Sequence, residues 1–299
     1  MSTGQGERKI KVKRSLAYYR ARRILVKAVL YSVLIALTLP IIIMYTWLFM
    51  QSVSETVLFG FIPSNFTLKG WRFLWQSIKF GEVILPPIWP VVMNSLIIAG
   101  GVTIIEVSIA LLAGYALSRL NVPYREPLLL LIIALHAFPG ITLLIAIFYL
   151  LNSMGLINTL LGVIIAKAAL EIPMGTWLIK GFFDAVPWDV EAAALVDGCS
   201  RLKAWYKVVL PIVKPGIAAI AIFAFLAGWN EFIFSLTFLL DPRLYPLSVH
   251  VYQLIGEFKY IDYTLLAATA LFYCIPPLVF FVITQKAFMK VPVVGVRGA

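Results

Sequence analysis

The chain has 299 residues, of which 62% are hydrophobic and 13% charged, and its mean hydropathy is +0.95. Soluble domains carry about 25% charged residues, and apolar runs of the ~20 residues that cross a bilayer recur along this chain. Composition therefore excludes a soluble domain, and the absence of ten-residue alternation excludes an outer-membrane barrel. The net charge of +11 does not indicate nucleic acid, because nine of the 25 Lys and Arg residues lie between Arg8 and Lys27. We predict an all-α, polytopic membrane protein with no nucleic-acid partner.

The first apolar run, from Ala28 to Met50, is 23 residues long. A secretion signal has an apolar core of only about 7–15 residues, so we predict a retained membrane helix behind a basic cytoplasmic tail at 1–27. The two cysteines, Cys199 and Cys274, lie far apart and lack ligand spacing. The sequence therefore predicts neither a disulfide framework nor a metal site.

Apolar runs of spanning length predict six membrane helices. They lie at roughly 28–50, 88–117, 127–151, 157–180, 212–240 and 264–289. An external loop at 51–87 separates the first helix from a transmembrane core at 88–290, and a tail at 291–299 ends the chain. Pro139 and Pro173 fall inside predicted spans, where they are either simple kinks or hinges of a moving pore.

The distribution of basic residues predicts the orientation of these helices. With the N-terminus inside, the cytoplasmic segments hold nineteen of the 25 Lys and Arg residues and the external segments hold five. Cytoplasmic loops of membrane proteins carry an excess of Lys and Arg. Both termini are therefore predicted to face the cytoplasm, together with a polar segment at 184–216.

This polar segment, 184–216, interrupts the apolar sequence of the second half of the chain. Pro187 suits the first turn of a helix, and Glu191 places negative charge near the positive end of the helix dipole. Gly198 can adopt the left-handed conformation that ends a helix, and Ser200 can cap the next one. The pattern predicts a short helix, a turn and a second helix.

Two interpretations of the polar segment are open from its residues. Arg201, Lys203 and Lys207 are consistent with an amphipathic helix on the lipid headgroups. The segment also resembles the cytoplasmic "EAA" loop of permease subunits from binding-protein-dependent ABC importers. That family pattern is Glu-Ala-Ala, three residues, Gly, nine residues, an aliphatic residue, any residue, then Leu-Pro.

The resemblance is close in the second half of the pattern. Gly198 is followed by nine residues and then by Val208, Val209, Leu210 and Pro211. Counting back from Gly198, the glutamate of the family pattern falls on Ala192, whereas the glutamate of this chain is Glu191. The resemblance assigns an ATPase-coupling role to Glu191, Ala192, Ala193, Ala194, Asp197, Gly198, Leu210 and Pro211.

Other segments resemble the carbohydrate branch of the same family. They are residues 61–68 in the external loop, Asn94-Ser95, the phrase 229–232 (Trp-Asn-Glu-Phe) and residues 294–298. The last segment is similar to the Gly-rich basic tail of the smaller maltose-type permease. The resemblance implies a further ATPase contact through Gly295, Arg297 and Gly298.

The resemblance implies a type I ABC importer permease (MetI-like) fold, located in the cytoplasmic (inner) cell membrane. It also implies three kinds of partner: a second homologous permease, two cytoplasmic ATPase subunits and an extracytoplasmic solute-binding protein. The sequence contains no G-x-x-x-x-G-K-[ST] phosphate loop. We therefore predict that the chain is not an enzyme and holds no cofactor, with ATP-Mg bound by the partner ATPase.

Polar side chains inside the predicted spans are costly in lipid and are candidates for function. Lys167 and Glu171 are four residues apart on one helix, which predicts an internal ion pair. Asn230 and Glu231 could bind the hydroxyls of a sugar or fix helix packing. His136 and His250 are expected to be structural. The predicted substrate-pathway candidates are Asn94, Trp229, Asn230 and Glu231.

The resemblance predicts half of the pore of an ATP-driven importer for a di- or oligosaccharide, with an α-glucoside as one candidate. The same architecture could carry a non-sugar solute. A different class is a proton-coupled secondary transporter with a relay built from Glu106, Lys167, Glu171 and Glu231. An intramembrane enzyme is disfavoured, because no Ser-His or paired-Asp arrangement is present.

Overall fold

The computed structural model describes residues 3–55, 57–58, 62–63, 65–80, 83–84, 87–255 and 262–288. It consists of two compact units, Met1–Leu68 and Lys69–Ala299. The boundary between them falls inside the predicted external loop at 51–87.

The first unit is dominated by one helix, α1 (Thr3–Ser52). Its apolar part, Arg22–Ser52, contains the predicted span 28–50, and the 18-residue apolar window within it has no buried residue. Uninterrupted apolar sequence favours a continuous helix here, because a helix satisfies every backbone hydrogen bond within itself. Two short antiparallel strands follow, β1 (Val57–Leu58) and β2 (Ile62–Pro63).

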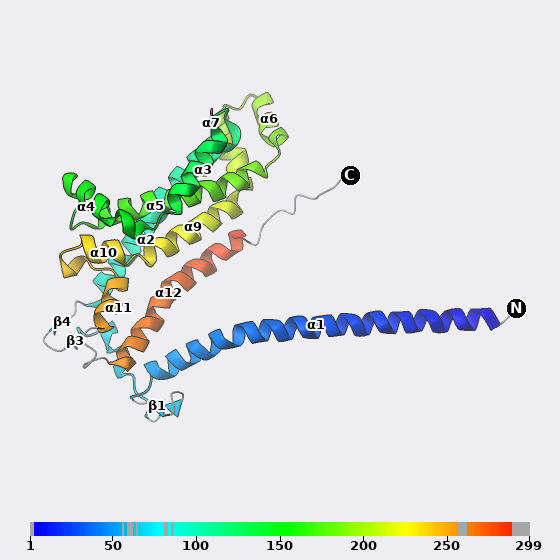
Figure 1. The fold of residues 1–299 in the computed structure, drawn as a ribbon, viewed down its shortest axis with the longest axis horizontal. Coiled ribbons are helices and arrows are strands. Elements are labelled where there is room, and N and C mark those ends of the chain that lie inside the picture. The colour runs from blue at the N-terminus through cyan, green and yellow to red at the C-terminus, as the bar shows by residue number, and fades with distance from the viewer. Residues whose placement is uncertain are drawn as a thin grey trace. The chain divides into compact units, whose positions relative to one another are not determined.

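Three long helices form the centre of the second unit (Figure 1): α2 (Ile88–Arg119), α5 (Leu160–Asp184) and α9 (Lys214–Trp229). Helix α2 packs against both α5 and α9, and α12 (Tyr263–Phe288) packs against α9. Small residues allow close approach, as expected where helices meet in a membrane. A Cβ atom added at Gly228 would lie 2.7 Å from the Cα of Ala99.

Two of the predicted helices, 127–151 and 212–240, are interrupted in the structure. The first is divided into α3 (Arg125–His136), a 3-10 turn η2 (Gly140–Leu143) and α4 (Leu144–Ser153), with a bend of 86°. Pro139, at this break, lacks a backbone N–H and cannot continue a helix. The second ends at Trp229, and α10 (Ile233–Phe238) begins after a three-residue break.

The remaining elements of the second unit are short. They are η1 (Lys69–Leu74), the antiparallel pair β3 (Lys79–Phe80) and β4 (Val83–Ile84), η4 (Pro242–Leu244) and α11 (Leu247–Ile255). Buried side chains from η1, α2, α9 and α11, among them Phe73, Ile88, Trp229 and Leu254, form one hydrophobic cluster.

Within the described residues, four helices are long and apolar enough to cross a bilayer: Arg22–Ser52, Ile88–Arg119, Leu160–Asp184 and Tyr263–Lys286. The number rises to six if each of two bent helix pairs counts as one span. One pair is 125–136 with 140–153, and the other is 201–212 with 214–229, bent by 78°. The protein is therefore multi-pass.

Candidate functional site

The polar segment at 184–216 folds as a helix, a turn and a second helical stretch, as its sequence predicted. Helix α6 (Trp188–Val196) ends before Gly198, which has a φ of +82°. Ser200 then caps α7 (Arg201–Ala204) by accepting a hydrogen bond from the Lys203 amide at 3.4 Å. A π-helical turn, η3 (Trp205–Val209), and α8 (Leu210–Ile212) lead to α9.

Glu191 is turned into the protein. It is fully buried, and its carboxylate accepts a hydrogen bond from the hydroxyl of Tyr115 on α2. The other carboxylate oxygen lies 3.5 Å from Nε of Arg119, one helical turn further along α2. A buried carboxylate requires such partners because desolvation penalises its charge. Glu191 therefore fastens α6 to the end of α2.

Arg119 connects three elements at the same end of the bundle. Its guanidinium donates to the carbonyl of Phe183 on α5 at 2.9 Å and to that of Val186 at 2.5 Å. It also lies 5.8 Å from the centre of the Trp188 ring at the start of α6. The rigid, planar arrangement of five donors in arginine suits this role. We call Tyr115, Arg119 and Glu191 the α2–α6 clamp.

Other side chains of the polar segment are exposed. The side chains of Val196, Leu202 and Tyr206 are 87%, 71% and 67% exposed. Among the residues predicted to couple to an ATPase, Ala193, Asp197, Gly198 and Pro211 are exposed, and Ala192, Ala194 and Leu210 are half-buried. Large exposed apolar side chains grouped on one surface mark interaction sites.

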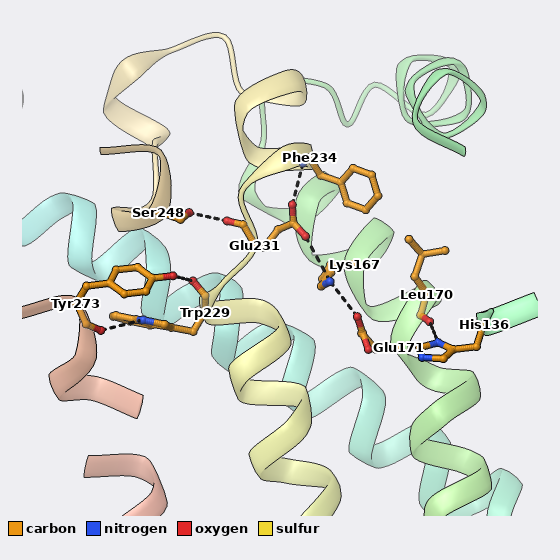
Figure 2. Close-up of polar contacts among 9 residues, drawn as sticks. All are labelled: His136, Lys167, Leu170, Glu171, Trp229, Glu231, Phe234, Ser248 and Tyr273. Carbon is orange, nitrogen blue, oxygen red and sulfur yellow. Dashed lines mark hydrogen bonds and ion pairs between the residues drawn. The ribbon is translucent and has the colours of Figure 1, made fainter. Parts of the chain in front are cut away.

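A second polar region lies among α3, α5 and the break between α9 and α10. Figure 2 shows Lys167 between two carboxylates: its Nζ is 2.9 Å from Glu171 and 3.6 Å from Glu231. The predicted pair of Lys167 with Glu171 is thus present. The other oxygen of Glu231 accepts a hydrogen bond from the Phe234 amide at 2.8 Å, in the first turn of α10. Glu231 therefore accepts a hydrogen bond from the first turn of α10 and links that turn to α5.

A cavity of about 510 Å³ opens beside this charged group. Its lining includes Lys167 and Glu171 from α5, together with His136 at the end of α3 and Phe138 in the break that follows. Nδ1 of His136 lies 2.9 Å from the Leu170 carbonyl, which fixes the imidazole against α5.

The comparison with known families decides the class of the protein. Residues 106–290 match the family described as "Binding-protein-dependent transport system inner membrane component". This match contains α5, the polar segment and the cavity. The chain belongs to this family.

Curated members of the family are similar in sequence to this protein over most of its length. The sulfoquinovosyl glycerol transport system permease of Agrobacterium fabrum is 36% identical over 67% of this chain and 70% of its own length. The diacetylchitobiose uptake permease of Streptomyces coelicolor is 29% identical over 87% of this chain and 85% of its own. The trehalose/maltose permease of Thermococcus litoralis is 32% identical over 64% of this chain and 69% of its own.

A solved structure shares the permease fold. The crystal structure of a bacterial ABC transporter that imports the acidic polysaccharide alginate contains a chain with a TM-score of 0.72 and 20% identity. The match covers 90% of this chain and 98% of the other. The fold of a binding-protein-dependent permease is therefore shared along nearly the whole protein.

The predicted substrate-pathway residues make contacts within the permease itself. Nδ2 of Asn94 donates to the carbonyls of Arg243 at 2.8 Å and Tyr245 at 3.2 Å. Trp229 is fully buried. Asn230 is exposed, and its side-chain oxygen accepts a hydrogen bond from the Tyr273 hydroxyl at 2.9 Å.

Sequence reasoning did not connect Tyr115 and Arg119 with Glu191, although their spacing places both on one face of α2. His136, expected to be structural, lines a cavity in the structure. The predicted ATPase contacts Gly295, Arg297 and Gly298 lie outside the described residues.

Proposed function

We propose that this permease forms, with a second homologous permease, the membrane pathway of an ATP-driven importer for a di- or oligosaccharide. Support for a sugar comes from its relatives, which include permeases named for sulfoquinovosyl glycerol, diacetylchitobiose and trehalose/maltose. An α-glucoside remains a candidate. The proposed location is the cytoplasmic (inner) membrane, with both termini inside.

The observation that carries the coupling part of the proposal is the exposed surface of the polar segment. Val196, Leu202 and Tyr206 add large apolar side chains to this surface, beside the exposed Arg201, Lys203 and Lys207. The α2–α6 clamp attaches the same segment to α2 and α5. A cytoplasmic ATPase subunit binding here would transmit its movement directly to the transmembrane helices. ATP-Mg would be held by that subunit, and a solute-binding protein would deliver the sugar on the other side.

Reconstituted transport tests this proposal. The complete transporter in proteoliposomes should import a labelled sugar only when its binding protein, its ATPase and ATP-Mg are present. The double substitution Leu202→Asp/Tyr206→Asp, on the exposed surface, should abolish ATPase co-purification and uptake. Substitution of the exposed Leu240→Asp, between α10 and η4 and outside the candidate spans, should leave co-purification intact. Uptake that continues without the ATPase and collapses with an uncoupler would instead identify a proton-coupled transporter.

A further inference from the structure

The cavity of about 510 Å³ lies beside a break in a membrane helix. The break separates α3 from η2, and its residue Phe138 lines the cavity with a ring that is 63% exposed. A helix break frees backbone polar groups, which are tolerated at membrane depth only against protein or water. The cavity wall at the break therefore does not face lipid tails.

The charged side chains of the lining also indicate that the cavity does not face lipid tails. The side chains of Lys167 and Glu171 are 20% and 22% exposed, and both line the cavity. An ionised side chain that faces hydrocarbon carries a large free-energy cost, so intramembrane charges face the bundle interior or an aqueous path. Together with the helix break, these charges place the cavity on the solute pathway or against the second permease.

The balance of charge in the cavity favours an uncharged ligand. Within the described part of the chain, Lys167 is the only ammonium or guanidinium group on the lining, and it already contacts the carboxylates of Glu171 and Glu231. Among the described residues of the lining, no free cation is left to receive a carboxylate or sulfonate. The lining instead combines hydrogen-bonding groups with the apolar face of Phe138, as ligand sites commonly do.

We propose that this cavity is a contact site for the transported solute, and that it accepts an uncharged sugar ring in preference to an acidic sugar. The inference rests on the proposed import function and narrows its substrate class. The ring of Phe138 would cover the apolar face of the sugar, and Lys167, Glu171 and His136 would bind its hydroxyls.

Filling the cavity tests the site without removing any of its polar contacts. Ala169 is exposed on α5 and lines the cavity. We expect Ala169→Trp to lower uptake of labelled maltose or diacetylchitobiose by about tenfold or more, since one extra methylene in a ligand pocket already costs roughly 10- to 200-fold. The matched control is Leu161→Trp, because Leu161 is also exposed on α5 but lies outside the cavity. It should transport as the unchanged protein does.

A cysteine variant provides a measurement that does not depend on tolerance of the tryptophan. In a Cys199→Ser/Cys274→Ala background, Ala169→Cys should react with a charged, membrane-impermeant methanethiosulfonate during turnover. The neutral sugar with its binding protein should suppress the labelling. No labelling would show that lipid or protein fills the cavity and would overturn the inference.

The outcomes separate the two proposals. If the unchanged transporter imports none of the tested sugars, the proposed function fails and the sugar site with it. If it imports a neutral sugar but Ala169→Trp is as active as Leu161→Trp, the site alone fails. If a uronate disaccharide is imported and both neutral sugars are refused, sugar import stands and the preference for uncharged sugars is wrong.

Discussion

The buried carboxylate of Glu191 accepts a hydrogen bond from the hydroxyl of Tyr115, 76 residues earlier in the chain. The glutamate of the family pattern would fall one residue later, at position 192, which is Ala192 in this chain. At position 191 the side chain points towards α2 and Arg119, and its carboxylate is inaccessible to a partner protein. The glutamate therefore fixes α6 within the permease.

Glu191→Ala should destabilise the permease even without its ATPase. The substitution leaves the guanidinium of Arg119 without its carboxylate, and breaking a buried ion pair costs about 3–5 kcal/mol. Thermal unfolding of the permease pair, purified without ATPase, measures this loss. Asp189→Ala is the matched control, since Asp189 is exposed in the same first turn of α6. Equal stability of the two variants, with ATPase binding lost only in Glu191→Ala, would show that Glu191 faces the ATPase.

Gly198→Ala should destabilise the permease solely because the backbone at this position has a positive φ. A Cβ atom at Gly198 meets nothing within 4 Å, but the φ of +82° strains any residue that carries one, at about 1–2 kcal/mol. Gly181→Ala is the control: its Cβ also meets nothing, and its helical position should gain roughly 0.5–1 kcal/mol. Thermal unfolding should therefore shift in opposite directions. If the unfolding midpoints of both variants shifted in the same direction, the left-handed conformation of Gly198 would not explain the effect of Gly198→Ala.

The sequence predicted the features that arise from local periodicity. The expected helix 88–117 corresponds to α2 (Ile88–Arg119), and the pairing of Lys167 with Glu171 follows from their spacing on one helix. The conformation of Gly198 and the cap at Ser200 are also local, so they could be read from residue types.

Features that depend on distant contacts could not be predicted in this way. The helix predicted at 212–240 is interrupted because Glu231 binds both Lys167 and the Phe234 amide. Asn230 and Glu231 mark this place as polar, but residue types alone do not show that the helix ends there. The partners of Glu191 were hidden for the same reason, since Tyr115 and Arg119 lie on a helix far away in the sequence.

Gly228→Ala should force α2 and α9 apart. The added Cβ would lie 2.7 Å from the Cα of Ala99, and backbone cannot move aside as a flexible side chain can. Overpacking of this kind costs about 1–3 kcal/mol. Gly100→Ala is the control, because a Cβ there meets nothing within 4 Å. Thermal unfolding of the purified complex should show a lower midpoint for Gly228→Ala only, and an unchanged midpoint would contradict the close crossing.

Acid should weaken the structure through His250 on α11, outside the candidate spans. The imidazole is 1% exposed, and burial lowers its pKa from 6.5 to about 4. Because the unfolded chain takes up a proton at higher pH than the folded one, stability is full above about pH 6.5 and falls as the pH drops towards 4. The difference in pKa corresponds to a loss of roughly 3 kcal/mol. Unfolding midpoints at pH 7.5 and 5.0 should therefore differ less in His250→Gln than in the unchanged protein. An equal difference in both would show that another group controls the acid sensitivity.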